Sequence, residues 1–258
     1  QSGGGITSYN NYFHDNAGSI LFELFGGIGA QSMLIGDNQF AGATHIWIKG
    51  MNNVTIENNT FDYSDPSYFE YWDINVLNSD NILIQYNLFT NSGSALSSPG
   101  TIVAYKSDVT IFDNDIIENV LSPAYSIWLN DGQYLVEQNT ISGSQTGILV
   151  TSAGDGTVAQ LRTNTITDTT TAIQVDNVLT SSNIGPGNTI SSSTTGILLK
   201  NCSNIPITGN TISASGTGIV VENCGSPVSG NNVNQGSGGT GINVKNGTYQ
   251  LSGNTISG

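Results

Sequence analysis

Charged residues are scarce in this chain of 258 residues: they make up 9% of the sequence, and only five of them are cationic. The chain therefore has few of the lysines, arginines and glutamates that favour helices, and no segment shows an apolar repeat of helical period. The net charge of −14 makes nucleic acids and anionic membranes poor partners. No apolar run approaches the length that spans a bilayer. We therefore expect no nucleic acid partner and no membrane insertion.

Cysteine and histidine are rare too, with two of each. So few cysteines exclude a disulfide-rich scaffold, and no spacing typical of a metal site is present. We therefore predict no metal centre and identify no cofactor. Calcium is the one cofactor that the acidic surplus favours, because Ca²⁺ takes carboxylate oxygens, but no motif indicates its ligands.

What the chain does contain is a repeat in which an asparagine is followed, two residues later, by a large apolar residue. Eleven copies occur, and successive copies lie 21 to 28 residues apart, the length of one solenoid coil. The asparagines are Asn11, Asn38, Asn59, Asn87, Asn114, Asn139, Asn164, Asn188, Asn210, Asn231 and Asn254. Residues of equal phase in successive coils become neighbours in space. The repeat therefore predicts contacts as well as a fold.

Each coil carries two further strand signals, exemplified by TGILL at residues 195–199 and VTI at residues 54–56. Three short strands per coil, joined by Gly, Asn and Ser corners, predict an all-β, single-stranded, right-handed parallel β-helix of about ten coils. We expect one domain over residues 1–258, with irregular, long-loop coils at 1–138 and regular short coils at 139–258. The asparagines should form a ladder at a tight corner, where side-chain amides bond the coils above and below.

The Asn-Thr-Ile-Ser and Thr-Gly-Ile repeats resemble those of the pectin-lyase-like right-handed β-helix superfamily, over essentially the whole chain. That resemblance implies the fold, but little about function. The superfamily includes polysaccharide lyases, polygalacturonases, epimerases, phage tailspikes and non-catalytic surface proteins. The polygalacturonase pattern of Asp pairs with Gly-His-Gly and Arg-Ile-Lys is absent from this sequence.

The phase of the repeat also pairs each cation with an acidic residue one coil away, which leaves no unengaged arginine for a lyase mechanism. The predicted pairs are Glu137–Arg162, Asp176–Lys200, Lys200–Glu222, Glu222–Lys245, Lys106–Asp131 and Glu23–Lys49. The same phasing stacks Cys202 on Cys224, within disulfide range. Two stacked buried thiols explain these cysteines equally well, so bridging stays open.

Three consecutive coils have an enlarged connection between the first and second strands, at residues 62–72, 90–100 and 117–125. Stacking puts these loops side by side on one flank, and long loops on a rigid scaffold are where function usually resides.

This flank supplies the candidate site residues, because aromatic rings stack on sugar rings and carboxylates accept hydrogen bonds from sugar hydroxyls. The candidate ligand-binding residues are Tyr63, Tyr68, Tyr71, Trp72, Trp47 and Trp128. The two tryptophans at 47 and 128 should point outward along one face, three coils apart. The candidate catalytic carboxylates, among which no spacing selects a pair, are Asp62, Asp73, Asp115 and Glu118. A satellite core beneath the loops would explain the aromatic residues equally well.

Together these patterns favour a secreted or cell-surface β-solenoid that binds a polysaccharide or glycan surface, or that serves as a rigid structural module. One alternative is a carbohydrate-active enzyme, a polysaccharide lyase or glycoside hydrolase, that uses the flank carboxylates. Another is a subunit of an end-to-end stacked filament, because the repeat runs to both ends of the sequence; continuation in a longer chain is the simpler explanation. Four sequons, at Asn53, Asn58, Asn201 and Asn246, would permit N-glycosylation.

Overall fold

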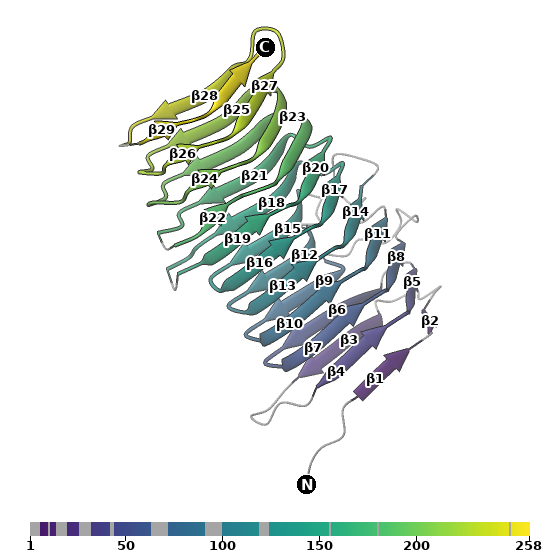
Figure 1. Cartoon of the computed structure of the whole chain (residues 1–258). Coiled ribbons are helices and arrows are strands. Elements are labelled where there is room, and N and C mark those ends of the chain that lie inside the picture. Colours follow the sequence, from purple (N-terminus) through teal and green to yellow (C-terminus); the bar gives the residue numbers. More distant parts are fainter. Residues whose placement is uncertain are drawn as a thin grey trace.

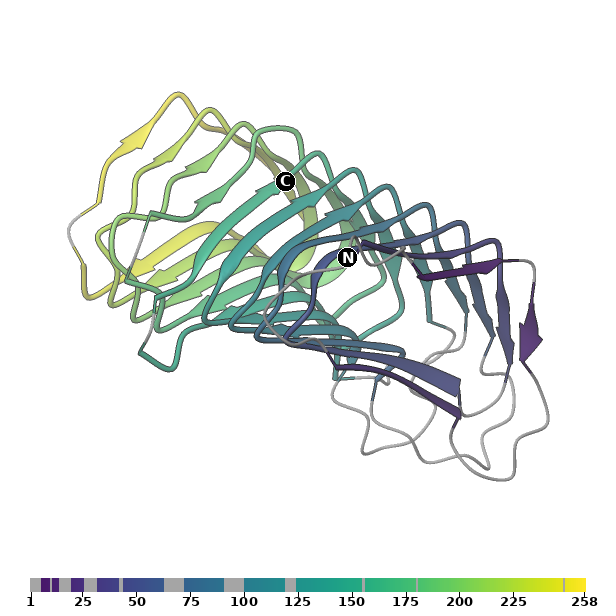
Figure 2. The ribbon, with the colours of Figure 1, turned by 90° about the horizontal axis from the view of Figure 1, so that it is seen from below.

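The computed structural model describes residues 6–9, 11–13, 20–25, 32–41, 44–62, 72–90, 100–118, 124–154, 156–179, 181–247 and 249–258. All regular elements of this described part are β-strands, and they stack into one elongated solenoid (Figure 1). Seen from below, the successive turns of the ribbon are displaced along a common axis (Figure 2).

Each coil contributes strands to three rows. The first row follows the repeat asparagines and consists of β2 (Tyr12–Phe13), β5 (Gln39–Ala41), β8 (Thr60–Asp62), β11 (Leu88–Thr90), β14 (Asp115–Ile117), β17 (Thr140–Ser142), β20 (Thr165–Thr167), β27 (Asn232–Gln235) and β30 (Thr255–Ser257). The second row consists of β3 (Ile20–Phe25), β6 (Thr44–Lys49), β9 (Ile74–Leu77), β12 (Gly100–Tyr105), β15 (Tyr125–Asn130), β18 (Thr146–Thr151), β21 (Thr171–Asp176) and β28 (Thr240–Lys245). Two strands run through both rows, β23 (Thr189–Lys200) and β25 (Thr211–Glu222). The third row consists of β1 (Ile6–Tyr9), β4 (Met33–Gly36), β7 (Asn52–Glu57), β10 (Asp80–Gln85), β13 (Asp108–Phe112), β16 (Gln133–Glu137), β19 (Val158–Arg162), β22 (Asn183–Ile184), β24 (Ile207–Thr208), β26 (Val228–Ser229) and β29 (Leu251–Ser252).

The strands of each row pair in parallel from one coil to the next. The third row forms a sheet of 11 strands, and the other two rows join into a sheet of 19 strands because β23 and β25 span both. Ile141 of β17, for example, lies opposite Ile166 of β20. The expected parallel β-helix with three strands per coil is confirmed, and the number of stacked strands is close to the ten coils expected.

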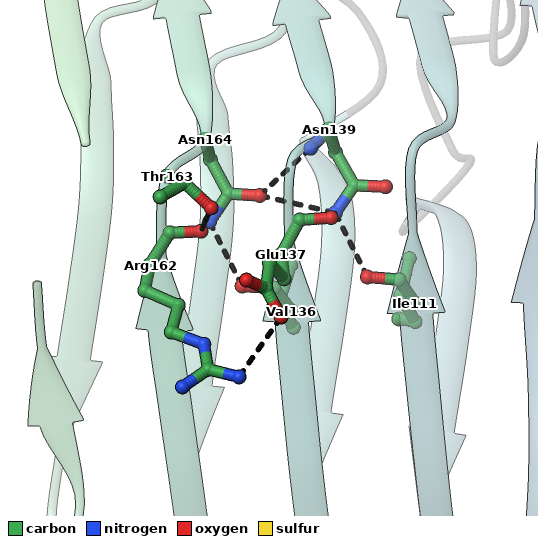
Figure 3. Close-up of polar contacts among 7 residues, drawn as sticks. All are labelled: Ile111, Val136, Glu137, Asn139, Arg162, Thr163 and Asn164. Carbon is green, nitrogen blue, oxygen red and sulfur yellow. Dashed lines mark hydrogen bonds and ion pairs between the residues drawn. The ribbon is translucent and has the colours of Figure 1, made fainter. Parts of the chain in front are cut away.

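The eleven repeat asparagines form one continuous ladder. In each step the side-chain Nδ2 donates to Oδ1 of the next asparagine along the chain, at 2.8–3.1 Å. Figure 3 shows one step, in which the backbone and side chain of Asn139 both reach Oδ1 of Asn164. The same Nδ2 donates to the carbonyl oxygen of Ile111 in the preceding coil, at 2.9 Å. The ladder thereby satisfies backbone groups at a corner where strand pairing ends.

The residue before each ladder asparagine has a left-handed backbone wherever that residue is described, with φ between 50° and 86°. In the last four coils it is a glycine, which adopts this conformation without strain. Thr163 occupies the same position before Asn164 with φ of 55° (Figure 3). A β-branched side chain is poorly suited to a left-handed backbone, so the threonine at position 163 lowers the stability of the fold.

Replacing Thr163 by glycine should raise the free energy of unfolding by about 0.5–1 kcal/mol, because relief of strain exceeds the added freedom of the unfolded chain. The matched control is Thr165→Gly, since Thr165 is also exposed but lies in the extended strand β20. That change should lower stability. Urea unfolding of both variants checks the expectation, and equal losses would contradict it.

The four sequon asparagines also occupy left-handed positions. Asn53, Asn58, Asn201 and Asn246 are exposed and have φ between 52° and 57°. Asparagine tolerates this backbone better than other residues with a Cβ. The corner geometry therefore explains these asparagines by itself, and glycosylation at the sequons stays a prediction.

A second ladder of buried side chains lies at the corner after the second row. The backbone N–H of Met51 donates to Ser79 Oγ at 3.1 Å, and that of Ser79 donates to Ser107 Oγ at 3.2 Å. The N–H of Cys202 donates in the same way to Cys224 Sγ, at 3.1 Å. Both cysteines are free and buried, and contact with the Cys224 thiol together with burial raises the pKa of Cys202. They take the place that serine has in equivalent coils.

Cys224→Ser should therefore leave stability nearly unchanged, because a hydroxyl can accept from Cys202 N–H and donate to the carbonyl of Glu222 as the thiol does. Cys224→Val has a similar volume but no acceptor, and should cost about 1–3 kcal/mol by leaving that N–H without a partner. Urea unfolding compares the two variants. Equal stability of the serine and valine variants would show that the thiol only fills space.

The apolar residues of the asparagine triplets fill the core. Phe40, Phe61 and Phe89 are fully buried, and their stacked ring centroids lie 4.7 and 4.6 Å apart. In the coils after β11, isoleucines and one valine take this place. In the Thr-Gly-Ile coils the backbone of the glycine passes close to this row of apolar side chains. A Cβ added to Gly218 would lie 2.2 Å from the side chain of Val233. The glycine of the motif is therefore needed for packing.

The predicted charge pairs are confirmed only in part. Arg162 Nη2 lies 3.0 Å from Glu137 Oε2, as expected (Figure 3). Lys200 lies opposite both Asp176 and Glu222 in register. Lys245 likewise lies opposite Glu222, but among these four described residues no charged groups come into ion-pair contact. The reason is that exposed pairs gain little in water, so long side chains are not held together.

In the irregular half the register differs from the expectation for one pair. Glu23 lies opposite Trp47, and Lys49 lies opposite Phe25, so the predicted Glu23–Lys49 pair is wrong by two positions. Lys106 lies at the expected level, opposite Asp131, because its backbone N–H donates to the carbonyl oxygen of Asn130. The Asp131 carboxylate accepts hydrogen bonds from the hydroxyl and backbone N–H of residues 152 and 153.

Candidate functional site

The three enlarged connections are anchored in adjacent coils. Strands β8, β11 and β14 pair with one another, as do β9, β12 and β15. We call the surface around the anchors, at residues 62, 72–73, 90, 100–101, 117–118 and 124–126, the long-loop flank. Residues 63–71, 91–99 and 119–123 lie outside the described part of the chain, and so do the candidates Tyr63, Tyr68 and Tyr71.

Two of the four candidate carboxylates come together at the base of this flank. Asp73 precedes β9, Glu118 follows β14, and each is only 5% exposed. Thr101 of β12 lies between Asp73 and Ser126 in register and is fully buried. Its hydroxyl donates to Glu118 Oε1 at 2.7 Å. The fold thus places two carboxyl groups and two hydroxyls in one buried cluster, which we call the acid cluster.

The environment of Glu118 makes its carboxyl group a weaker acid than an ordinary glutamate. Burial raises the pKa of Glu118 well above its ordinary value, and the nearby Asp73 carboxylate raises it further; the hydrogen bond from Thr101 opposes the rise. Glu118 Oε2 and Ser126 Oγ are buried and have no hydrogen-bond partner among the described residues. A buried carboxyl group whose pKa is raised is suited to acid–base chemistry and to binding hydroxyl groups.

The other two candidate carboxylates lie elsewhere. Asp62 ends β8 and Asp115 begins β14, both on the outer face of the first row, where Asp115 is exposed. They flank inward-pointing residues, Phe61 and Ile116, so the period of two turns their side chains outward. Neither joins Asp73 and Glu118 in the acid cluster.

The tryptophans follow the predicted phase but are less exposed than expected. Trp47 and Trp128 lie in one column of the second row, three coils apart, through Asn75 and Val103. Both are half-buried, as is Trp72 beside the acid cluster. Trp128 Nε1 donates to the hydroxyl of residue 151 at 3.0 Å, and its ring lies 5.9 Å from that of residue 125. Packing against neighbouring side chains therefore covers part of each ring.

Thr101 and Ser126 were not among the sequence candidates, although the repeat carries a signal for them. Both directly precede a second-row isoleucine, Ile102 or Ile127, at the position that Gly147 has in a later coil. Polar residues at a position that packs against the core row need a special reason. The three coils that replace this glycine with Asp73, Thr101 and Ser126 are those that the long connections enter.

The described residues include no group of three or more His, Cys, Asp or Glu side chains arranged to hold a metal ion. Among the same residues, no helix has the length and apolar character needed to cross a membrane.

Comparison with solved structures shows the same fold in tailspike proteins of E. coli bacteriophage HK620. A tailspike in complex with pentasaccharide matches with a TM-score of 0.65 and 14% identity, over 86% of this chain and 49% of the tailspike chain. A variant with one glutamate replaced, also in complex with pentasaccharide, matches with 0.64 and 14% identity, over 96% and 60%. A further variant matches with 0.62 and 16% identity, over 84% and 46%. The chain thus spans about half of the length of these tailspikes. A comparison with curated proteins gives no match.

A family model described as a right-handed β-helix region matches residues 1–157 and again residues 100–256. The two matches cover nearly the whole chain and confirm the right-handed fold expected from the repeat. On this ground the chain belongs to the right-handed β-helix family.

Proposed function

We propose that this β-helix binds a glycan across the long-loop flank. The observation that carries the proposal is the acid cluster of Asp73, Thr101, Glu118 and Ser126, beside the residues that anchor three adjacent connections. Carboxyl and hydroxyl groups suit sugar hydroxyls, and enlarged loops on a rigid scaffold are where ligand sites usually form. The tailspikes of similar fold that hold a pentasaccharide support this ligand class. A secreted or cell-surface location accompanies this function and is part of the proposal.

The half-buried Trp72 is the aromatic residue best placed to receive a sugar ring, because it directly precedes Asp73. One face of an aromatic ring can stack on the C–H face of a sugar while the neighbouring carboxylate accepts from its hydroxyls. Trp47 and Trp128, in a single column of the second row, extend the apolar surface along the solenoid axis.

Retention on a panel of immobilised polysaccharides tests binding. The wild-type chain should be retained by at least one polysaccharide, and Trp72→Ala should weaken retention about tenfold or more, as for an aromatic anchor. Tyr249→Ala is the matched control, because Tyr249 is 49% exposed and lies near the C-terminal end of the described solenoid. If no polysaccharide on the panel retains the wild-type chain, the proposal is contradicted and a role as a rigid structural module is favoured.

Hydrolysis of the bound glycan is a second candidate, favoured by the raised pKa of Glu118 beside Asp73. Glu118 would protonate the glycosidic oxygen as its bond to the anomeric carbon breaks. Asp73 would deprotonate the water that attacks this carbon, or would attack the carbon itself to form an ester that water then hydrolyses. A lyase has less support, because Arg162 is engaged with Glu137 in the third row, away from the flank.

Product analysis separates the enzyme from the binder. Hydrolysis creates new reducing ends, whereas a lyase creates unsaturated ends, and both can be followed on a retained polysaccharide with and without added calcium. Glu118→Gln should lower hydrolysis about 10²- to 10⁴-fold while retention persists. Asp113→Asn, in an exposed left-handed position, serves as control. Retention without any products would leave the binding function and contradict hydrolysis.

A further inference from the structure

The hydrogen bond between Thr101 and Glu118 makes the two oxygens of one carboxyl group different. The Thr101 hydroxyl donates to Glu118 Oε1 at 2.7 Å, an ordinary length for a bond between two oxygens. Glu118 Oε2 is buried and has no hydrogen-bond partner among the described residues. The protein therefore holds one oxygen of this carboxyl group and leaves the other available to a ligand.

This difference decides where the proton of Glu118 resides. In a protonated carboxyl group the carbonyl oxygen is the better acceptor, and the hydroxyl oxygen is the donor. Because Oε1 accepts from Thr101, the protonated form has its carbonyl at Oε1 and its proton on Oε2. Burial favours the protonated form, since a charged carboxylate is costly away from water.

The hydroxyl of Thr101 is itself held in a fixed direction. Thr101 is fully buried, and its strand β12 pairs in parallel with β9 on one side and with β15 on the other. Its backbone carbonyl oxygen accepts from the N–H of Asp73 at 3.0 Å. A β-branched side chain has few rotamers, so this hydroxyl is aimed at Oε1 before any ligand binds.

The packing of the coil does not ask for a threonine at this position. In the described coils from β18 to β28 the equivalent residue is glycine or alanine. A Cβ added to Gly147, for example, would lie 2.9 Å from Ile166 Cγ2. A longer polar side chain at this place is explained by what it contacts, and Thr101 contacts Glu118.

Two further titratable side chains follow Thr101 along the same column. Asp73 is the neighbour of Thr101, and His45 of β6 is the neighbour of Asp73, because the N–H of Ile46 donates to the Asp73 carbonyl oxygen at 2.8 Å. Burial raises the pKa of Glu118 most, Asp73 raises it further, and the bond from Thr101 lowers it. Thr101 thus also stabilises the carboxylate that remains after Oε2 has lost its proton.

We propose that Thr101 is a positioning residue, whose hydroxyl holds Glu118 Oε1 so that Oε2 is the atom that donates to the bound glycan. This inference rests on the proposed function, because the glycan is the ligand of the same site. In binding, Oε2 donates a hydrogen bond to a sugar oxygen. In hydrolysis, the proton passes from Oε2 to the glycosidic oxygen, which keeps the electron pair of its broken bond to the anomeric carbon.

Carbon-13 NMR of the glutamate carboxyl groups tests the inference without any ligand. The sequence has six glutamates, and Glu118→Gln identifies the signal of Glu118 by its loss. Thr101→Val keeps the branched shape but removes the donor, and should lower the acid dissociation constant of Glu118 about tenfold, which raises its pKa by about one unit. Thr101→Ser keeps the hydroxyl and should stay within about twofold of the wild-type chain.

Thr169→Val is the matched control for loss of a buried hydroxyl. Thr169 lies between β20 and β21 and is buried, and its hydroxyl shares a hydrogen bond of 2.8 Å with that of Ser193. This variant should lose stability in urea as Thr101→Val does, and leave the titration of Glu118 unchanged. Infrared difference spectra give a second measurement. The carbonyl stretch of protonated Glu118 should move to higher frequency in Thr101→Val alone, because that carbonyl loses its hydrogen bond.

The outcomes are distinct. An unchanged titration and carbonyl band in Thr101→Val would overturn the inference. An equal change in Thr101→Ser would also overturn it, because packing and not the hydroxyl would then be responsible. If a retained polysaccharide is hydrolysed, the alkaline limb of kcat should move to higher pH in Thr101→Val, and an unmoved limb would count against the role of Thr101. Retention by no polysaccharide would overturn the proposed function, while the NMR comparison would still decide whether Thr101 holds Oε1.

Discussion

Replacing Asn139 by leucine should lower the free energy of unfolding by about 3–5 kcal/mol, one of the largest effects of any single change in this chain. Asn139 Oδ1 accepts from both the backbone N–H and the side chain of Asn114, and its Nδ2 donates to Ile111 and Asn164. All these groups lie in the interior, so losing the amide leaves several buried polar groups without partners. Urea unfolding gives the measurement.

The control for this change is Asn234→Leu, because Asn234 is exposed in β27 and takes no part in the ladder. That variant should stay within about 0.5 kcal/mol of the wild-type chain. A similar small effect at Asn139 would mean that water replaces the ladder bonds at little cost, and the ladder would then be a consequence of the fold and not a cause of its stability.

Glu118→Gln should change the dependence of stability on pH. Burial raises the folded-state pKa of Glu118, so between its unfolded and folded pKa values the native state binds more protons than the unfolded state. Stability should therefore fall as the pH rises from about the ordinary glutamate value of 4.5 towards the raised one. Glutamine keeps the acceptor for Thr101 and cannot ionise, so the variant should lose less stability over that range.

Unfolding by urea at a series of pH values measures this difference. The Glu118→Gln variant should be close to the wild-type chain at acidic pH and more stable at alkaline pH. Parallel curves for Glu118→Gln would show that Glu118 ionises as an ordinary exposed carboxylate, and would remove the main support for its role as an acid.

The regular coils could be predicted from sequence almost residue by residue. Where one coil is 21 to 25 residues long and its corners are short, phase counted from the asparagine gives the register, and Glu137–Arg162 follows directly. The prediction failed for Glu23 and Lys49, because Phe22, and not Ile20, takes the second-row place of Ile46, which shifts the register by two positions. The register of a solenoid can thus be predicted from sequence only where the equivalent residues of successive coils can be identified.

The two carboxyl groups of the acid cluster were predictable from sequence, but its hydroxyl groups and its arrangement were not. Asp73 and Glu118 were both candidates, yet they come from different rows and different coils, so their phases gave no reason to pair them. Asp73 and Glu118 meet because Asp73, the residue before the second-row isoleucine, is directed into the solenoid. Gly147 has the same position in a later coil. Side-chain contacts across a corner depend on how the backbone bends there, which the period of the repeat does not encode.

The asparagine ladder makes each coil an interchangeable unit. Every inner rung accepts at its Oδ1 from the asparagine before it and donates to the Oδ1 of the asparagine after it, so a duplicated or deleted coil finds the same complementary groups on both sides. None of the described residues between the first and second rows takes part in the ladder. A gene encoding this scaffold can therefore change its number of coils, or the length of one loop, independently, which lets the loops diversify while the frame that supports them is inherited intact.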